Sequence, residues 1–417
     1  MRFSRVVCTR RSTGTGARPE LNGALLVVLC AIMILNPIVA NMYLPALGIM
    51  ADDLGTTIAG IQVALTAFLL GVAVGQLAVG ALSDALGRRR VIIIGFAVLT
   101  AAGVLVAAAP NLDLLIVGRV FQGLGASAGV VVIRAVIADI GVGTQIPRAY
   151  SLLVGTLAIG PLVASFLGTV LLQVGGWRLI LVGITVICAL FLVLVTWRLP
   201  ETLAPERRAT LHPGRMAATY GRLLKDPAYV GNALTMAFAL GGIMAHVSAS
   251  SFVAQDVLGA DVWGFWGMFS VYGLSVLVGG MANAPLSARF GPERMQVVAL
   301  SVAIASSAAL TVTAAAGWLT VATYLTFMAL GCGSATAVMA NATTLTLARA
   351  SFAAASGAAL MGCIQFTAGA IASPIGGLWG PHTAVPMAAT MFVCFALSLG
   401  ARVFARHWER RMPLPPR

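Results

Sequence analysis

The stretch that decides the fold is Gly80-Ala81-Leu82-Ser83-Asp84-Ala85-Leu86-Gly87-Arg88-Arg89-Arg90, which lies between two long apolar segments. A glycine favours a sharp turn, and three consecutive arginines favour the cytoplasmic side of a membrane. The aspartate one helical turn before the arginines can pair with one of them or lie at a helix end. We predict a cytoplasmic turn between two membrane helices, with a simple basic anchor as the alternative. The residues expected to take part in conformational gating are Gly80, Asp84, Gly87, Arg88 and Arg89.

A weaker copy of this stretch occurs 204 residues later, about half the chain away. Leu286-Ser287-Ala288-Arg289-Phe290-Gly291, followed by Arg294, repeats the Leu-Ser pair, the glycine and the basic residues. Such a repeat indicates two related halves, as in many secondary transporters. We expect Arg289, Gly291 and Arg294 to form a second gating loop.

Composition determines the class of protein. Hydrophobic residues make up 59% of the 417 residues and charged residues 9%, whereas a soluble domain carries roughly 25% charge. The mean hydropathy is +0.96, and the length suffices for about twelve spans of ~20 residues. We predict an all-α integral membrane protein whose main partner is the lipid bilayer. The net charge of +13 does not indicate a nucleic-acid partner, because the basic residues interrupt apolar runs and form no single stripe.

Twelve apolar runs support this prediction, and they divide into two bundles of six transmembrane helices. They are 21–40, 58–81, 91–109, 113–137, 149–173, 178–197, 228–250, 264–287, 295–316, 318–346, 355–379 and 383–404.

Charge is sorted by side when these runs are threaded through a membrane from a cytoplasmic N-terminus. All but a few of the 26 lysines and arginines fall on the cytoplasmic side, as the positive-inside rule requires. Both termini are therefore expected in the cytoplasm. The predicted parts are a cytoplasmic tail 1–20, a six-helix bundle 21–197, a cytoplasmic linker 198–227, a six-helix bundle 228–404 and a cytoplasmic tail 405–417.

Several motifs together resemble the major facilitator superfamily of transporters, and within it the Bcr/CflA-like branch of drug:proton antiporters. The stretch Gly80–Arg90 resembles the superfamily's loop between its second and third helices, although Ala85 replaces a usual arginine. The other matching motifs are Met42-Tyr43-Leu44-Pro45-Ala46-Leu47, Arg119-Val120-Phe121-Gln122-Gly123-Leu124-Gly125-Ala126, Gly155-Thr156-Leu157-Ala158-Ile159-Gly160-Pro161 and Ala372-Ser373-Pro374-Ile375-Gly376-Gly377.

The resemblance implies the major facilitator fold and a secondary transporter that works by alternating access. It implies export of small amphipathic or hydrophobic drugs or antibiotics across the inner cell membrane in exchange for protons, and helix packing by Gly155, Gly160, Pro161 and Pro374. The alternatives are an importer of a nutrient or signalling compound with the same fold, and a drug uniporter driven by the membrane potential. Because both halves lie in one chain, a monomer is expected.

Proton coupling is the open point, because the branch usually has an aspartate where this chain has Asn41. An asparagine forms hydrogen bonds but exchanges no proton near neutral pH. Asp139, Asp84 and His246 are the remaining candidate proton carriers. A charged substrate driven by the membrane potential is the alternative. We expect no cofactor, and the proton gradient or the potential supplies the driving force.

Arg119 is the leading candidate site residue. A charge at the centre of a membrane helix costs roughly 2.5–3.5 kcal/mol on insertion scales, so it normally faces the bundle interior. Gln122 lies three residues on, on the same helical face. Arg119 either serves proton exchange, as the resemblance implies, or is held by backbone carbonyls of a neighbouring helix. Arg134 and Asp139 lie nearer the cytoplasmic end, where a gate or an interfacial anchor is expected.

His246 lies in the seventh run, near Ser248 and Ser250. A histidine titrates near ~6.5 and could carry protons, or it could simply bond to a hydroxyl. The sequence shows no catalytic set, no metal-ligand spacing and no Gly-x-x-x-x-Gly-Lys-[Ser/Thr] nucleotide-binding motif. We therefore predict a transporter and not an enzyme.

Overall fold

The computed structural model describes residues 23–140, 145–208, 212–379 and 382–412. Its long helices are joined by short 3₁₀ or π turns and tight loops. The α-helices are α1 (Gly23–Asn41), α2 (Leu47–Asp53), α3 (Ile58–Leu86), α4 (Arg88–Ala107), α5 (Leu112–Ile140), α6 (Gln145–Arg198), α7 (Pro213–Leu224), α8 (Pro227–Phe252), α9 (Val262–Phe290), α10 (Pro292–Ala315), α11 (Val321–Arg349), α12 (Ala354–Ala372) and α13 (Val385–Arg411). The short turns are η1 (Leu44–Ala46), η2 (Pro205–Arg207), η3 (Val253–Val257), η4 (Ser351–Ala353) and η5 (Ser373–Gly377).

Eleven helices in the described residues are long and apolar enough to cross a membrane. One of them, α6, contains two spans, because its backbone leaves the helical conformation at Gly175 and Gly176, where Gly176 has a φ of 74°. Only glycine adopts this φ readily, so it is the point at which the chain reverses. With α6 divided there, twelve spans result, and the predicted all-α membrane fold is confirmed.

Three segments of the chain differ from the predicted ones. The first span continues past α1 through α2 to Asp53. The last helix, α13, runs on to Arg411, into the segment expected as a tail, because basic residues near a helix C-terminus are favourable. The linker contains α7, in which Met216, Thr219, Tyr220 and Leu223 recur at helical spacing and are the more buried side chains. An amphipathic helix of this kind rests one face on the protein.

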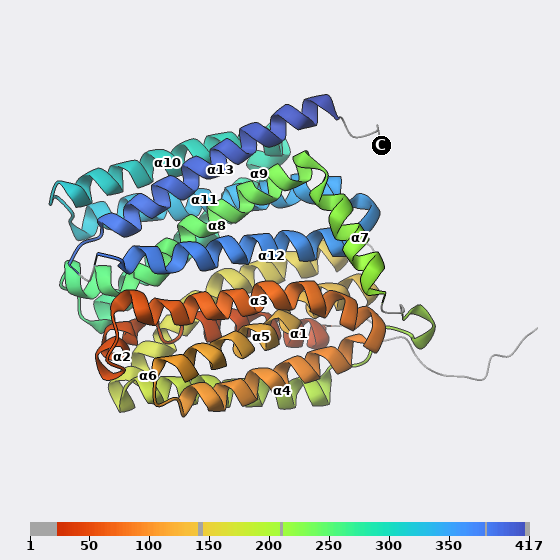
Figure 1. Ribbon diagram of the computed structural model, residues 1–417, viewed down its shortest axis with the longest axis horizontal. Helices are drawn as coiled ribbons and strands as arrows, with labels where there is room; N and C mark the ends of the chain where they lie inside the picture. The colour runs from red at the N-terminus through yellow and green to blue at the C-terminus, as the bar shows by residue number, and fades with distance from the viewer. Residues whose placement is uncertain (1–22, 141–144, 209–211, 380–381, 413–417) are drawn as a thin grey trace, which may run out of the picture.

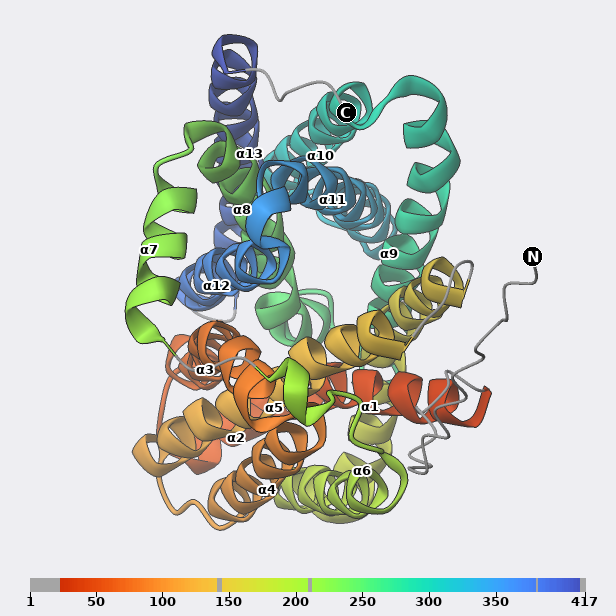
Figure 2. The ribbon, with the colours of Figure 1, turned by 90° about the vertical axis from the view of Figure 1, so that its right-hand side faces the viewer.

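The helices form two bundles that lie side by side (Figure 1). We call α1–α6 the first half and α8–α13 the second half. The halves pack directly on each other where α3 meets α12 and where α6 meets α9. Seen along the helices, α7 runs down one side from the second half toward α3 (Figure 2).

Two tight turns at one end of the molecule have the same backbone. Gly87 has φ 97° and ψ 153°, and Gly291 has φ 85° and ψ 148°. Each ends one long helix and begins the next within a single residue. This match supports the pseudo-repeat inferred from the sequence. We call the end with these turns and α7 the basic end, and the opposite end, where Thr57 caps the start of α3 and Asp261 caps the start of α9, the far end.

Close helix contact depends on particular glycines. A side chain on Gly71 of α3 would collide with the carbonyl oxygen of Val120 and would lie 3.0 Å from Gly123 Cα, both in α5. A side chain on Gly80, in the same helix, would meet only Val131 Cγ1 at 4.0 Å. Gly71 is therefore required for packing, whereas Gly80 has room.

We expect Gly71→Ala to destabilise the protein and Gly80→Ala to leave it intact. The first change must push α3 away from α5, at a cost of about 1–3 kcal/mol. The second adds a methyl group in open space and replaces a poor helix former, so its effect is within about 1 kcal/mol. Thermal unfolding of both purified variants tests this. Equal unfolding temperatures for the two variants would contradict it.

Candidate functional site

Arg119 lies on α5, 1% exposed, about two turns from the start of the helix. Its Nη1 donates to the carbonyl oxygen of Val39 in α1 and to Oε1 of Gln122, both at 3.0 Å. Its guanidinium carbon lies 4.1 Å from the ring centre of Tyr43 and 5.2 Å from that of Phe68. The pair with Gln122 forms, and a backbone carbonyl of the neighbouring helix α1 holds the arginine; its role in proton exchange stays a prediction.

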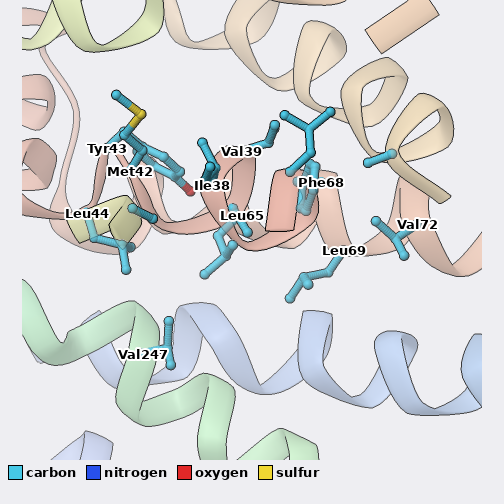
Figure 3. Close-up of a cluster of buried hydrophobic side chains, with 14 of the residues drawn as sticks. Ile38, Val39, Met42, Tyr43, Leu44, Leu65, Phe68, Leu69, Val72 and Val247 are labelled. Carbon is cyan, nitrogen blue, oxygen red and sulfur yellow. The ribbon is translucent and has the colours of Figure 1, made fainter. Parts of the chain in front are cut away.

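The second terminal nitrogen of Arg119, Nη2, is buried and has no hydrogen-bond partner. Among the described residues, no carboxylate lies within ion-pair distance of the guanidinium. The surroundings are apolar, since Val39, Tyr43 and Phe68 belong to one buried cluster (Figure 3). Cation–π contact accounts for part of the charge's stability. The site thus keeps a positive charge and one terminal NH₂ group, Nη2 of Arg119, without an acceptor next to aromatic faces.

Asn41 ends α1 and is 9% exposed. Its Nδ2 donates to the carbonyl oxygen of Pro37, one turn back in the same helix, at 2.8 Å. The amide is thus committed to holding the end of α1. This contact gives Asn41 a structural role at the position where an acid was expected.

Arg88 is the centre of a charged cluster at the basic end. Its guanidinium donates to Asp84 at 2.5 Å, to Asp139 at 2.9 Å and to Ser83 at 2.7 Å. Its backbone N–H donates to Glu201 at 2.9 Å. The Arg88 and Asp139 side chains are 8% and 9% exposed. The cluster therefore ties together α3, α4, α5 and the chain after α6.

Other candidates from the first half are spread around this cluster. Arg89 donates to the carbonyl oxygen of Thr196 at 2.7 Å and so holds α6. Arg134 is exposed on α5, five residues before Asp139. The predicted pairing of Asp84 with one of the arginines is confirmed by its ion pair with Arg88. The sequence pointed to Asp139 separately and did not single out Glu201, which lies shortly after α6. Its position just after an apolar run was the available signal.

The second gating loop also forms a tight turn, at Gly291. Arg289 and Arg294 are exposed, and Arg289 lies over the ring of Phe290, 5.1 Å from its centre. Neither forms an ion pair within the described residues. In this conformation the two arginines lie on the outer surface of the loop, and their role in gating stays a prediction.

Arg402 of α13 is the charged centre of the second half, and it is 1% exposed. Its Nη1 donates to Glu409 at 2.9 Å and to Asn232 Oδ1 at 3.3 Å. Its Nη2 lies 3.3 Å from Glu293, an ion pair by distance without hydrogen-bond alignment. Glu293, from the second loop, thus joins α10 to α13. Within the part of the chain that the structure describes, each half thus has one buried arginine at the basic end, Arg88 and Arg402.

His246 is 1% exposed in α8. Its ring lies 5.2 Å from Tyr272 of α9 and 6.0 Å from Tyr324 of α11, measured between ring centres. Neither ring nitrogen has a hydrogen-bond partner. The expected bond to a serine hydroxyl is absent from these contacts. The neighbouring serine, Ser248, instead donates to the carbonyl oxygen of Ser373 at 2.5 Å.

The glycines and prolines of the helix-packing motifs differ in how much they contribute to packing. A side chain on Gly160 of α6 would collide with the ring of Pro37 in α1, so this position brings the two helices together. Pro161 follows inside α6. Gly155 has no atom near its missing side chain, which does not fit a packing role. Pro374 lies at the start of η5, where its fixed φ suits a helix beginning.

The two halves are joined by hydrogen bonds at the far end. Nε2 of Gln62 donates to the carbonyl oxygen of Ser248 at 2.9 Å, and Oγ1 of Thr66 donates to that of Ala370 at 3.0 Å. The ring of Phe166 in α6 lies 6.2 Å from Trp263 and 5.6 Å from Trp266 in α9. At the basic end, the hydroxyl of Tyr220 in α7 lies 3.4 Å from the carbonyl oxygen of Leu77. The structure is therefore closed at the far end.

Comparison with known proteins gives consistent matches. A sequence profile described as Major Facilitator Superfamily matches residues 29–377. The Bacillus subtilis protein named uncharacterized MFS-type transporter YdgK is 34% identical over 89% of this chain and 92% of its own length. The Haemophilus influenzae protein named bicyclomycin resistance protein homolog is 28% identical over 89% of this chain and 93% of its own length. The solved structure of the Escherichia coli xylose transporter XylE, in a partially occluded inward-open conformation, superposes with a TM-score of 0.69 at 13% identity. It covers 94% of this chain and 98% of the solved one.

Proposed function

The chain belongs to the major facilitator superfamily, in its Bcr/CflA-like drug-efflux branch, and from this premise we propose that it exports small amphipathic drugs in exchange for protons. The observation that carries the proposal is Arg119, a buried cation with an unused N–H group and two aromatic rings beside it. The relative named for bicyclomycin resistance supports a drug as the substrate.

The setting of Arg119 fits an amphipathic substrate better than a strongly charged one. A free N–H of Nη2 suits a carbonyl, ether or hydroxyl oxygen, and the amide of Gln122 adds a second polar contact. The rings of Tyr43 and Phe68 suit apolar or aromatic parts. A site of this composition binds molecules by shape and apolar area, with few fixed hydrogen bonds, so it accepts several compounds.

Alternating access follows from the two-half architecture, in which the halves rock about a site near the membrane centre. We assign the basic end to the cytoplasm, because arginines accumulate there. The far end then faces outward, and its closure by Gln62 and Ser248 corresponds to a state that takes up drug from the cytoplasm. Both termini lie in the cytoplasm, and the protein acts as a monomer in the inner membrane.

Two of the three candidate proton carriers are tied to one cation. Asp84 and Asp139 both accept hydrogen bonds from Arg88. Both carboxylates thus hold Arg88 where α3, α4 and α5 meet. We therefore assign the Arg88 cluster to conformational gating and not to proton exchange.

Uptake of drugs into everted membrane vesicles tests the function. A panel of lipophilic cationic and neutral drugs is added, and the pH gradient and the membrane potential are collapsed separately. We expect uptake to stop when the pH gradient is collapsed. Loss of cation uptake only when the potential is collapsed would indicate a uniporter, and no uptake of any drug would overturn the export proposal.

A further inference from the structure

His246 is a buried titratable side chain whose polar atoms no contact within the described residues satisfies. It is 1% exposed, and neither Nδ1 nor Nε2 has a hydrogen-bond partner. Leaving a buried polar atom unpaired costs about 1–3 kcal/mol. Two such atoms on one ring indicate that the described conformation satisfies His246 poorly and that another conformation satisfies it better.

We propose that His246 is the proton-binding group of the transporter, and that its protonation opens the far end. This inference rests on the proposed drug:proton exchange and names the site that the exchange would use in place of the acid replaced by Asn41. The proposal stands on three observations: the enclosure of the ring, the groups that face it and its position beside the closure between the halves.

The groups around His246 can accommodate a neutral imidazole but offer no counter-charge to an imidazolium. The titratable groups that face this part of α8 are Tyr272 from α9, Tyr324 and Cys332 from α11, and Cys394 from α13, beside Gly241. All are neutral at physiological pH in their usual forms. The nearest carboxylate along α8 and η3, Asp256, is exposed about three turns away. An imidazolium here would have no counter-charge and no acceptor for its two N–H groups.

The protonated ring therefore favours a conformation in which water or a polar group reaches it. Tyrosine faces can hold a cation once such access exists, by about 0.5–2 kcal/mol. The step is a simple proton transfer: hydronium gives its proton to the neutral imidazole, leaving water and an imidazolium. The imidazolium returns the proton to water when the protein closes again.

The position of His246 connects it to the closure between the halves. Two residues further along α8, the carbonyl oxygen of Ser248 accepts the hydrogen bond from Gln62 of the first half at 2.9 Å. The Ser248 hydroxyl donates to the carbonyl oxygen of Ser373 in η5, and Val247 packs in the same apolar cluster as Leu65 (Figure 3). A shift of α8 that relieves a charged His246 would strain these contacts. Protonation and opening of the far end are thus coupled.

The direction of coupling suits an exporter. Outside the cell, His246 takes up a proton while the far end is open and the drug leaves. When the far end closes as in this structure, water or a polar group no longer reaches the imidazolium from outside, and the proton is released on the cytoplasmic side. The neutral state that remains is the one that takes up the next drug molecule from the opposite side.

The test measures the conformation of the drug-free protein as a function of pH. Nitroxide labels are placed on Ile49→Cys in α2 and Val321→Cys in α11, which are 50% and 41% exposed at the far end of the two halves. The partly exposed native cysteines are replaced by serine. Distances between the labels, measured by double electron–electron resonance, give the ratio of open to closed molecules.

We expect this ratio to rise by up to about tenfold for each pH unit below about 6.5, because only the open state binds the proton. His246→Gln and His246→Phe should both abolish the pH dependence, and the second keeps a ring in the aromatic pocket if the first folds poorly. His407→Gln, an exposed histidine on α13, is the matched control and should keep the slope.

A slope that survives in both His246 variants would overturn the inference, as would a native protein without any slope. Vesicle uptake separates this result from the proposed function. A pH-dependent opening without uptake of any drug would refute the export proposal and leave His246 as the proton site. Drug uptake driven by the pH gradient in His246→Gln would support the export proposal and overturn the assignment of His246 as the proton site.

Discussion

Arg119→Ala is expected to fold normally and to lose gradient-driven drug export. The arginine brings cation–π contact, worth up to about 2 kcal/mol when desolvated, and one bond each to Val39 and Gln122. Its removal also removes the cost of burying a charge without a carboxylate partner, so the free energy of unfolding should change little. The polar group offered to the substrate disappears, and uptake into everted vesicles should fall about 100-fold or more, to background.

Two controls make this result specific. Arg119→Lys keeps the charge, but a single ammonium group cannot reproduce the planar fork of a guanidinium, so we expect weak residual export. Arg178 also lies over an aromatic ring, 4.1 Å from Trp177, but its side chain is 54% exposed. Arg178→Ala should export drug at the native rate. Gradient-driven export by Arg119→Ala at the native rate would show that Arg119 serves packing alone.

Arg88→Ala is expected to insert into the membrane, to lose stability and to export slowly. It leaves Asp139, whose side chain is 9% exposed, without its cation. Breaking a buried ion pair by removing one partner costs about 3–5 kcal/mol. The bond between the Arg88 backbone and Glu201 does not depend on the side chain, so part of the turn should persist. Thermal unfolding and vesicle uptake measure the two effects separately.

The matched control is Arg90→Ala, in the same stretch but exposed, which should behave as the native protein. The double variant Arg88→Ala/Asp139→Asn removes the unpaired charge and should recover much of the stability, with export still slow. If Arg88→Ala and Arg90→Ala unfold at the same temperature and export equally fast, the Arg88 cluster has no role in either property.

The features that could be predicted from the sequence are those that depend on neighbouring residues in one helix. Arg119 and Gln122 are three residues apart, and helical spacing alone brings them together. The turns at Gly87 and Gly291 were found because a turn with positive φ favours glycine. Twelve spans followed from apolar length. These properties depend on residues that are close together in the sequence, so they can be predicted from it.

The parts that could not be predicted depend on which helices meet. Arg88 and Asp139 are 51 residues apart, and only the packing of α4 against α5 joins them. Arg402 lies near the end of an apolar run and is easily counted as part of a basic tail. The rings around His246 come from two other helices, α9 and α11, so no spacing revealed that its nitrogens lack partners. The helix α7 was missed because polar and basic residues dominate the linker.

Arg88 and Arg402 have a consequence for assembly of the chain. In the first half the backbone N–H of Arg88, at the start of α4, donates to Glu201 after α6; in the second half Glu293, near the start of α10, lies 3.3 Å from Arg402 of α13. The corresponding helices of the two halves are thus joined by different contacts, a backbone hydrogen bond in one half and an ion pair in the other. A helix inserted into the wrong half would not meet its own partner group, so these contacts favour assembly of each bundle from its own helices.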